Sequence, residues 1–243
     1  GDEIRHIDWK LWGKTDRFYV KRYEEETNLK AHILIDQSNS MGYASNDINK
    51  LEYSKILAAS LSYMLIKNQD AVGLYMFDSG IKKIIPPHSN KGHLSVVLSE
   101  MDKIKPNKDT NIAKALHECA EKTNKKGLII LISDLMDDEN DIIKGLKHFI
   151  YKGHEVIIFH ILDPEEINFN FKERIRFKDL ESNQEIITDP RQLQKDYKQK
   201  IKEFMDFYKM QCGKLRIDYV PISTNQTLDV ALSEYLLKRK KLN

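Results

Sequence analysis

Three oxygen-bearing side chains, Asp36, Ser38 and Ser40, stand at alternate positions directly after the apolar run 31–35. Residues two apart in extended backbone point to the same side, so these three side chains can converge on one point. Oxygen atoms are the ligands that small, hard cations such as Mg²⁺ prefer in proteins. The spacing therefore predicts a metal site in the loop that follows this run.

Two further oxygen groups belong to the same prediction. Asp134 stands at the carboxyl end of the predicted strand that contains the apolar run 128–132, and Thr110 lies just before a helical pattern that begins at Ile112. In the doubly wound strand order 3-2-1-4-5-6, the first and fourth strands are neighbours, and ligands bind in the crevice at their carboxyl ends. We therefore expect Asp134 to face Asp36 across this crevice, and the Thr110 hydroxyl to reach the same place.

Strand-like runs alternate with runs of helical period along the chain, which is typical of βαβ units. The predicted strands cover residues 30–35, 71–77, 81–85, 127–133, 155–160 and 215–220. The predicted helices cover residues 51–67, 92–101, 112–122, 141–151, 191–212 and 228–242. The pattern predicts an α/β, Rossmann-like, doubly wound fold with a mainly parallel six-stranded sheet. The tight turn at 78–80 makes the third strand an antiparallel edge strand.

The length of 243 residues suits one domain with additions. We divide the chain into an N-terminal appendage at residues 1–29 and a domain at residues 30–243, with a β-hairpin inserted near residues 165–189. The appendage is expected to be the end of a longer preceding region.

Composition argues against several partner classes. Lys and Arg number 39 and Asp and Glu 37, a net charge of +2 that predicts neither a nucleic-acid surface nor a membrane surface. No apolar stretch approaches the roughly 20 residues that cross a bilayer, so we expect no membrane insertion. Cys119 and Cys212 lie in predicted helices, far apart in sequence, which indicates reduced thiols and a cytoplasmic location.

The five predicted ligands, in their order along the chain, resemble the metal-ion-dependent adhesion site of a von Willebrand factor type A (vWA) domain. The set consists of Asp36, Ser38, Ser40, Thr110 and Asp134. Residues flanking this set are similar to the bacterial domain-of-unknown-function family 58. They are Gly1, Asp2, Arg5, 7–10, Arg22, Glu24 or Glu25, 179–181, Tyr197 and 228–239.

The resemblance implies a Mg²⁺ site, with Mn²⁺ or Ca²⁺ as possible substitutes, that works in protein–protein interaction and not in catalysis. It implies direct contacts to the ion from Ser38, Ser40 and Thr110, and contacts partly through water from Asp36 and Asp134. One coordination position would stay open for a partner's Asp or Glu carboxylate, because two carboxylates only balance the charge of the ion. The family also implies a MoxR-type AAA+ ATPase, or its client, as a candidate partner in chaperone-like assembly or maturation of other proteins.

Two other interpretations stay open. Asp36, Ser38 and Ser40 are also compatible with an ordinary polar turn, and Thr110 with an N-cap of the following helix. Ser40, Asp134 and His160 follow the chain order of an α/β serine hydrolase triad, and residues 38–42 partly match the G-x-S-x-G elbow without its first glycine. A serine hydrolase that uses Ser40 is therefore the alternative function.

Overall fold

The computed structural model describes residues 29–107, 111–170, 175–178, 185–188, 190–229 and 232–233. Residues 1–28 of the predicted appendage (1–29) and most of the predicted last helix lie outside these residues, so the proposed division into parts stays a prediction.

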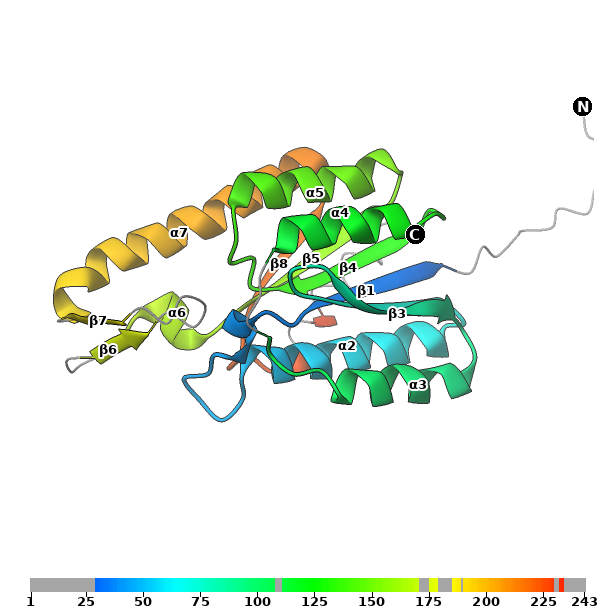
Figure 1. The fold of residues 1–243 in the computed structure, drawn as a ribbon, viewed down its shortest axis with the longest axis horizontal. Helices are drawn as coiled ribbons and strands as arrows, with labels where there is room; N and C mark the ends of the chain where they lie inside the picture. Colours follow the sequence, from blue (N-terminus) through cyan, green and yellow to red (C-terminus); the bar gives the residue numbers. More distant parts are fainter. Residues whose placement is uncertain are drawn as a thin grey trace, which may run out of the picture.

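A six-stranded sheet forms the centre of the fold (Figure 1). Its strands are β1 (Lys30–Asp36), β2 (Ala71–Phe77), β3 (Ile81–His88), β4 (Leu128–Ser133), β5 (Glu155–Leu162) and β8 (Asp218–Ser223). Their order is β3-β2-β1-β4-β5-β8, and all neighbours are parallel except the β2–β3 pair. This is the predicted α/β fold with an antiparallel edge strand, and β1 and β4 are neighbours as expected.

Helices cover both faces of the sheet. They are η2 (Asn39–Gly42), α2 (Lys50–Lys67), α3 (Lys91–Asp102), α4 (Ile112–Lys122), α5 (Glu139–Tyr151), α6 (Pro164–Asn168) and α7 (Pro190–Leu215). Figure 1 shows α2 and α3 on one face and α4, α5 and α7 on the other. Alternate residues of β1 enter different cores: Ile33 packs with the α2 side and Leu34 with the α4 and α5 side. Burial on both faces explains why the central strands are continuously apolar.

A separate two-stranded antiparallel sheet, β6 (Ile175–Lys178) with β7 (Glu185–Thr188), lies where the sequence predicts an inserted hairpin. It lies beyond α6 in the chain and is drawn near α6 in Figure 1. The insertion therefore interrupts the chain between β5 and α7 without entering the main sheet.

Helix ends correct two details of the prediction. Asn111, and not Thr110, is the N-cap of α4, because its side chain accepts a hydrogen bond from the Lys114 amide. The helix predicted at 191–212 continues to Leu215, and the chain turns at Arg216, whose φ is 56°. Asn49 is the N-cap of α2, because its side chain accepts a hydrogen bond from the Glu52 amide.

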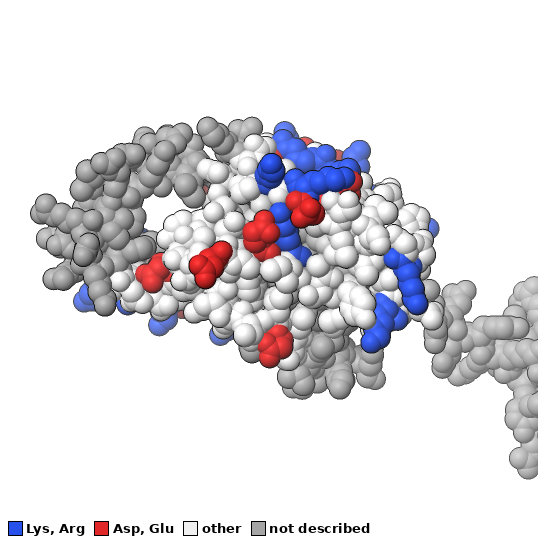
Figure 2. Space-filling view, turned by 90° about the horizontal axis from the view of Figure 1, so that it is seen from below, with Lys and Arg blue, Asp and Glu red and all other residues white. Residues whose placement is uncertain are grey.

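The distribution of charges on the surface and the state of the two cysteines are as the composition predicts. On the face shown in Figure 2, acidic and basic side chains intermingle. Both Cys119 and Cys212 are free and buried, as predicted. Among the described residues, no helix combines the length and the apolar character needed to span a bilayer.

Candidate metal centre

The loop after β1 presents the first three predicted ligands. The Oγ atoms of Ser38 and Ser40 lie 3.0 Å apart, so the two hydroxyls face one another as the alternate spacing predicts. The backbone amide of Ser38 donates to Oδ1 of Asp36 at 2.8 Å, which folds the loop back on the fully buried carboxylate. Asp36, Ser38 and Ser40 therefore form one compact oxygen cluster at the carboxyl end of β1.

The end of β4 meets this cluster through a residue that the sequence did not single out. The Ser133 hydroxyl donates to Oδ2 of Asp36 at 2.6 Å, across 97 positions of sequence. Asp134 is the next residue, and its side chain is also fully buried. The structure thus brings the two predicted acids to one edge of the sheet, as the adjacency of β1 and β4 requires.

Thr110 lies outside the described residues, but the chain on both sides of it is anchored to the two loops. On one side, the Asn107 amide donates to the Gln37 carbonyl at 2.8 Å, and Asn107 forms a parallel bridge with Ser38. On the other side, the Ile112 amide donates to the Asp137 carboxylate at 2.8 Å. The described residues Asn107 and Ile112, on either side of Thr110, therefore lie at the Asp36 loop and the Asp134 loop.

A buried lysine completes the cluster. Nζ of Lys50, the first residue of α2, lies 2.7 Å from Oδ2 of Asp134 and 2.6 Å from Oε1 of Glu166. Burial alone would lower the pKa of Lys50, but the two carboxylates outweigh it and hold this pKa above its ordinary value. The ammonium is therefore a permanent charge inside the cluster.

The electrostatics of this cluster suit a divalent cation. Burial and the nearby Asp134 carboxylate raise the pKa of Asp36 to about 7, although Ser133 and Ser38 donate hydrogen bonds to it. A positive ion beside the two acids would relieve this repulsion. The cluster contains three carboxylates and one ammonium, those of Asp36, Asp134, Glu166 and Lys50. When all four are ionised, its net charge is −2, which one Mg²⁺ would balance.

The described residues contain no cluster of three or more His, Cys, Asp or Glu side chains of metal-binding type. The predicted set is of another kind, with two carboxylates and three hydroxyls.

The geometry does not support the hydrolase alternative. His160 is fully buried, its Nε2 lies 3.0 Å from the Asp134 carbonyl oxygen, and its Nδ1 lies 2.6 Å from the Tyr219 hydroxyl. Because Nε2–H donates to the carbonyl, Nδ1 accepts from Tyr219, and neither ring nitrogen is left for Ser40. Burial also lowers the pKa of His160 to about 4.

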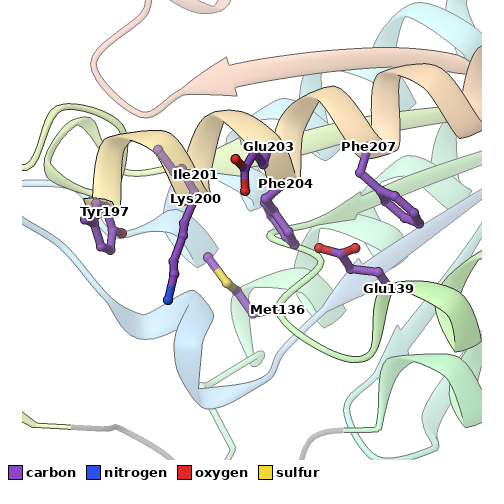
Figure 3. Close-up of a pocket in the computed structure, with 8 residues that line it drawn as sticks. All are labelled: Met136, Glu139, Tyr197, Lys200, Ile201, Glu203, Phe204 and Phe207. Atoms are coloured by element: carbon purple, nitrogen blue, oxygen red, sulfur yellow. The ribbon is translucent and has the colours of Figure 1, made fainter. Parts of the chain in front are cut away.

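A groove of about 620 Å³ lies between α7 and the segment after β4 (Figure 3). Its lining consists of Met136, Glu139, Tyr197, Lys200, Ile201, Glu203, Phe204 and Phe207. Ser40 and His160 do not line it, so it offers no substrate pocket to the hydrolase alternative. Met136 lies two positions after Asp134, and its amide donates to Oδ1 of that residue at 3.3 Å.

The family described as "protein of unknown function DUF58" matches residues 1–205. The chain belongs to this family. The match spans the positions of all five predicted ligands and confirms the predicted family, while the flanking residues 228–239 lie beyond it. A comparison with curated proteins finds no match.

Solved structures show the same fold at low sequence identity. The BatB protein from Bacteroides thetaiotaomicron is 20% identical with a TM-score of 0.58, and it covers 88% of this chain and 99% of its own. An aerotolerance-related membrane protein from Bacteroides fragilis, with multiple mutations to serines, is 17% identical with a TM-score of 0.60 and the same coverage. The VWA domain of SpRpn10 is 13% identical with a TM-score of 0.48, covering 85% of this chain and 94% of its own. Together with the strand order, the first two similarities show the doubly wound, mainly parallel α/β fold of this DUF58 chain.

Three residues of the site escaped prediction: Ser133, Lys50 and Glu166. Ser133 is the last residue of β4, and its place next to Asp134 was the one available signal. Lys50 and Glu166 are separated by 116 positions, and each is an ordinary charged residue in the first turn of a helix. Their pairing depends on how α6 packs against the start of α2, which no local pattern reports.

Proposed function

We propose that this chain is a Mg²⁺-dependent protein-interaction module. Asp36, Ser38, Ser40, Thr110 and Asp134 would hold the ion, and a partner's Asp or Glu carboxylate would complete its coordination. The observation that carries the proposal is the 2.6 Å hydrogen bond between Ser133 and Asp36, because it joins the loop of three ligands to the strand that ends at Asp134. The bound ion would supply a positive charge that attracts an anionic oxygen of the partner.

Each residue has a defined task in this proposal. Ser38 and Ser40 present neutral oxygens that withdraw little of the ion's positive charge. Asp36 and Asp134 supply the negative charge. Ser133 fixes Asp36 by donating to one of its oxygens, while its own Oγ accepts the Leu135 amide at 2.9 Å. No proton transfer or covalent step is needed, which agrees with an interaction module and not an enzyme.

The choice of partner rests on the family resemblance. A MoxR-type AAA+ ATPase, or a protein on which it acts, is the proposed partner, with assembly or maturation of other proteins as the proposed process. A cytoplasmic location is part of the same proposal.

The test is a calorimetric titration of the protein with MgCl₂. We expect saturable 1:1 binding to the wild type, and loss of at least tenfold in affinity for Asp36→Ala and for Thr110→Ala. Asp102→Ala, which removes an exposed carboxylate at the end of α3, serves as the control and should bind like the wild type. Equal Mg²⁺ affinities for the wild type and Asp36→Ala would refute the proposal.

A further inference from the structure

Lys50 occupies a position that is unfavourable for a cation in two respects. It is the first residue of α2, where the helix dipole presents its positive end. Its side chain is also completely removed from solvent, and burying an ammonium group is costly. Asp134 and Glu166 offset both effects, so Lys50 belongs to the acid cluster and not to the helix surface.

Glu166 is the second carboxylate that holds the ammonium in place. Oε2 of Glu166 accepts the Asp163 amide at 2.8 Å in the capping box of α6, and Oε1 accepts from Lys50. Asp163 in turn accepts the Ser45 amide at 2.9 Å, which fixes the chain between the metal loop and α2. Lys50 is therefore held by two carboxylates, and one of them is itself fixed in the capping box of α6.

Both acids of the site already accept short hydrogen bonds from other side chains. Oδ2 of Asp134 accepts from Lys50, and Oδ2 of Asp36 accepts from Ser133. The Lys50 ammonium competes with an ion for Oδ2 of Asp134, which leaves Oδ1, the acceptor of the longer 3.3 Å bond from the Met136 amide, to bind a metal directly or through water. Ca²⁺ takes about six to eight oxygens and often a bidentate carboxylate, whereas Mg²⁺ takes six in a tight octahedron and keeps several waters.

We propose that Lys50 makes this site selective for Mg²⁺ over Ca²⁺, because it withholds one oxygen of Asp134 from the ion. Lys50 acts through Asp134 and is a positioning residue, not a ligand. This inference rests on the proposed metal-dependent function, and it identifies Ca²⁺ as a poor substitute at the site.

The test compares the dissociation constants of Mg²⁺ and Ca²⁺ by calorimetry. Lys50→Met frees Oδ2 of Asp134, and the double variant Lys50→Met/Glu166→Gln also keeps the net charge of the cluster. The control is Lys55→Met, on the same helix, where Nζ contacts Oε1 of Glu52 at 2.9 Å. We expect the ratio of the Ca²⁺ constant to the Mg²⁺ constant to fall at least tenfold in the two Lys50 variants and to stay unchanged in the control.

Other outcomes separate this inference from the proposed function. Wild type that binds Mg²⁺, with an unchanged ratio in folded Lys50 variants, would overturn the role of Lys50 alone. Wild type that binds Ca²⁺ as tightly as Mg²⁺ would overturn it as well, even if neither Lys50 variant folds. Wild type and variants that bind neither ion would refute the metal site itself.

Discussion

The Ser133 hydroxyl donates to the Asp36 carboxylate at 2.6 Å and so ties the end of β4 to the end of β1. Both residues are fully buried, and the same Ser133 oxygen accepts the Leu135 amide. This relationship places Asp134, the next residue, in the same cluster as Ser38 and Ser40.

Ser133→Ala should destabilise the protein and weaken metal binding together. The change leaves one oxygen of a buried carboxylate and the Leu135 amide without their partner, which costs about 2 kcal/mol. Urea unfolding should show this loss in stability, and calorimetry should show weaker Mg²⁺ binding. Ser60→Ala on α2 is the control, because its exposed hydroxyl bonds only the Ile56 carbonyl. Wild-type values for both quantities in Ser133→Ala would show that this bond does not organise the site.

Gly127 lies where β4 begins, and a side chain there has no room. A Cβ built on Gly127 would lie 2.2 Å from the Lys30 carbonyl oxygen, a backbone atom of β1. We expect Gly127→Ala to lower the free energy of unfolding by about 2 kcal/mol or more, because β1 and β4 must move apart. Gly213→Ala, in the helical interior of α7 with open space around it, should instead stabilise by about 0.5 kcal/mol. The same sign for both variants in urea unfolding would contradict this account.

Much of this fold follows from the sequence, and the convergence of Asp36 with the end of β4 shows why. Each acid stands at the carboxyl end of an apolar strand, and the doubly wound strand order makes those strands neighbours. The environment of Lys50 does not follow in this way, because a lysine in the first turn of a helix is usually exposed to solvent. The end of α7 also differs from the prediction, because the helix continues to Leu215 and the strand after it begins three residues later than predicted.

The stability of the protein should fall in mild acid because of His32. Burial, with His154 and Lys30 nearby, lowers the pKa of His32 to about 4. The unfolded chain takes up this proton near pH 6.5 and the folded chain only near pH 4, so stability is lost as the pH falls through this window. The full loss is about 3 kcal/mol. Urea unfolding of wild type and His32→Leu at about pH 7 and about pH 4.5 measures it. Parallel changes in the two proteins would exclude His32 as the source.

Ser40 should not react as a hydrolase nucleophile. Both ring nitrogens of His160 are engaged, with the Asp134 carbonyl and the Tyr219 hydroxyl, so the histidine of the alternative triad cannot take the Ser40 proton. Incubation with an activated phosphonate, followed by mass spectrometry, should leave the protein at its native mass. A stoichiometric adduct on Ser40 would revive the enzymatic alternative.

The most direct test of the metal centre is a crystal structure of the protein grown with Mn²⁺, in which anomalous scattering locates the ion. The account predicts one Mn²⁺ at the carboxyl edge of β1 and β4, with the hydroxyls of Ser38, Ser40 and Thr110 about 2.1 Å away, the distance of small octahedral cations. It also predicts that Lys50 keeps its contact with Asp134. An ion bound elsewhere, or a Thr110 hydroxyl outside its coordination sphere, would contradict the central claim.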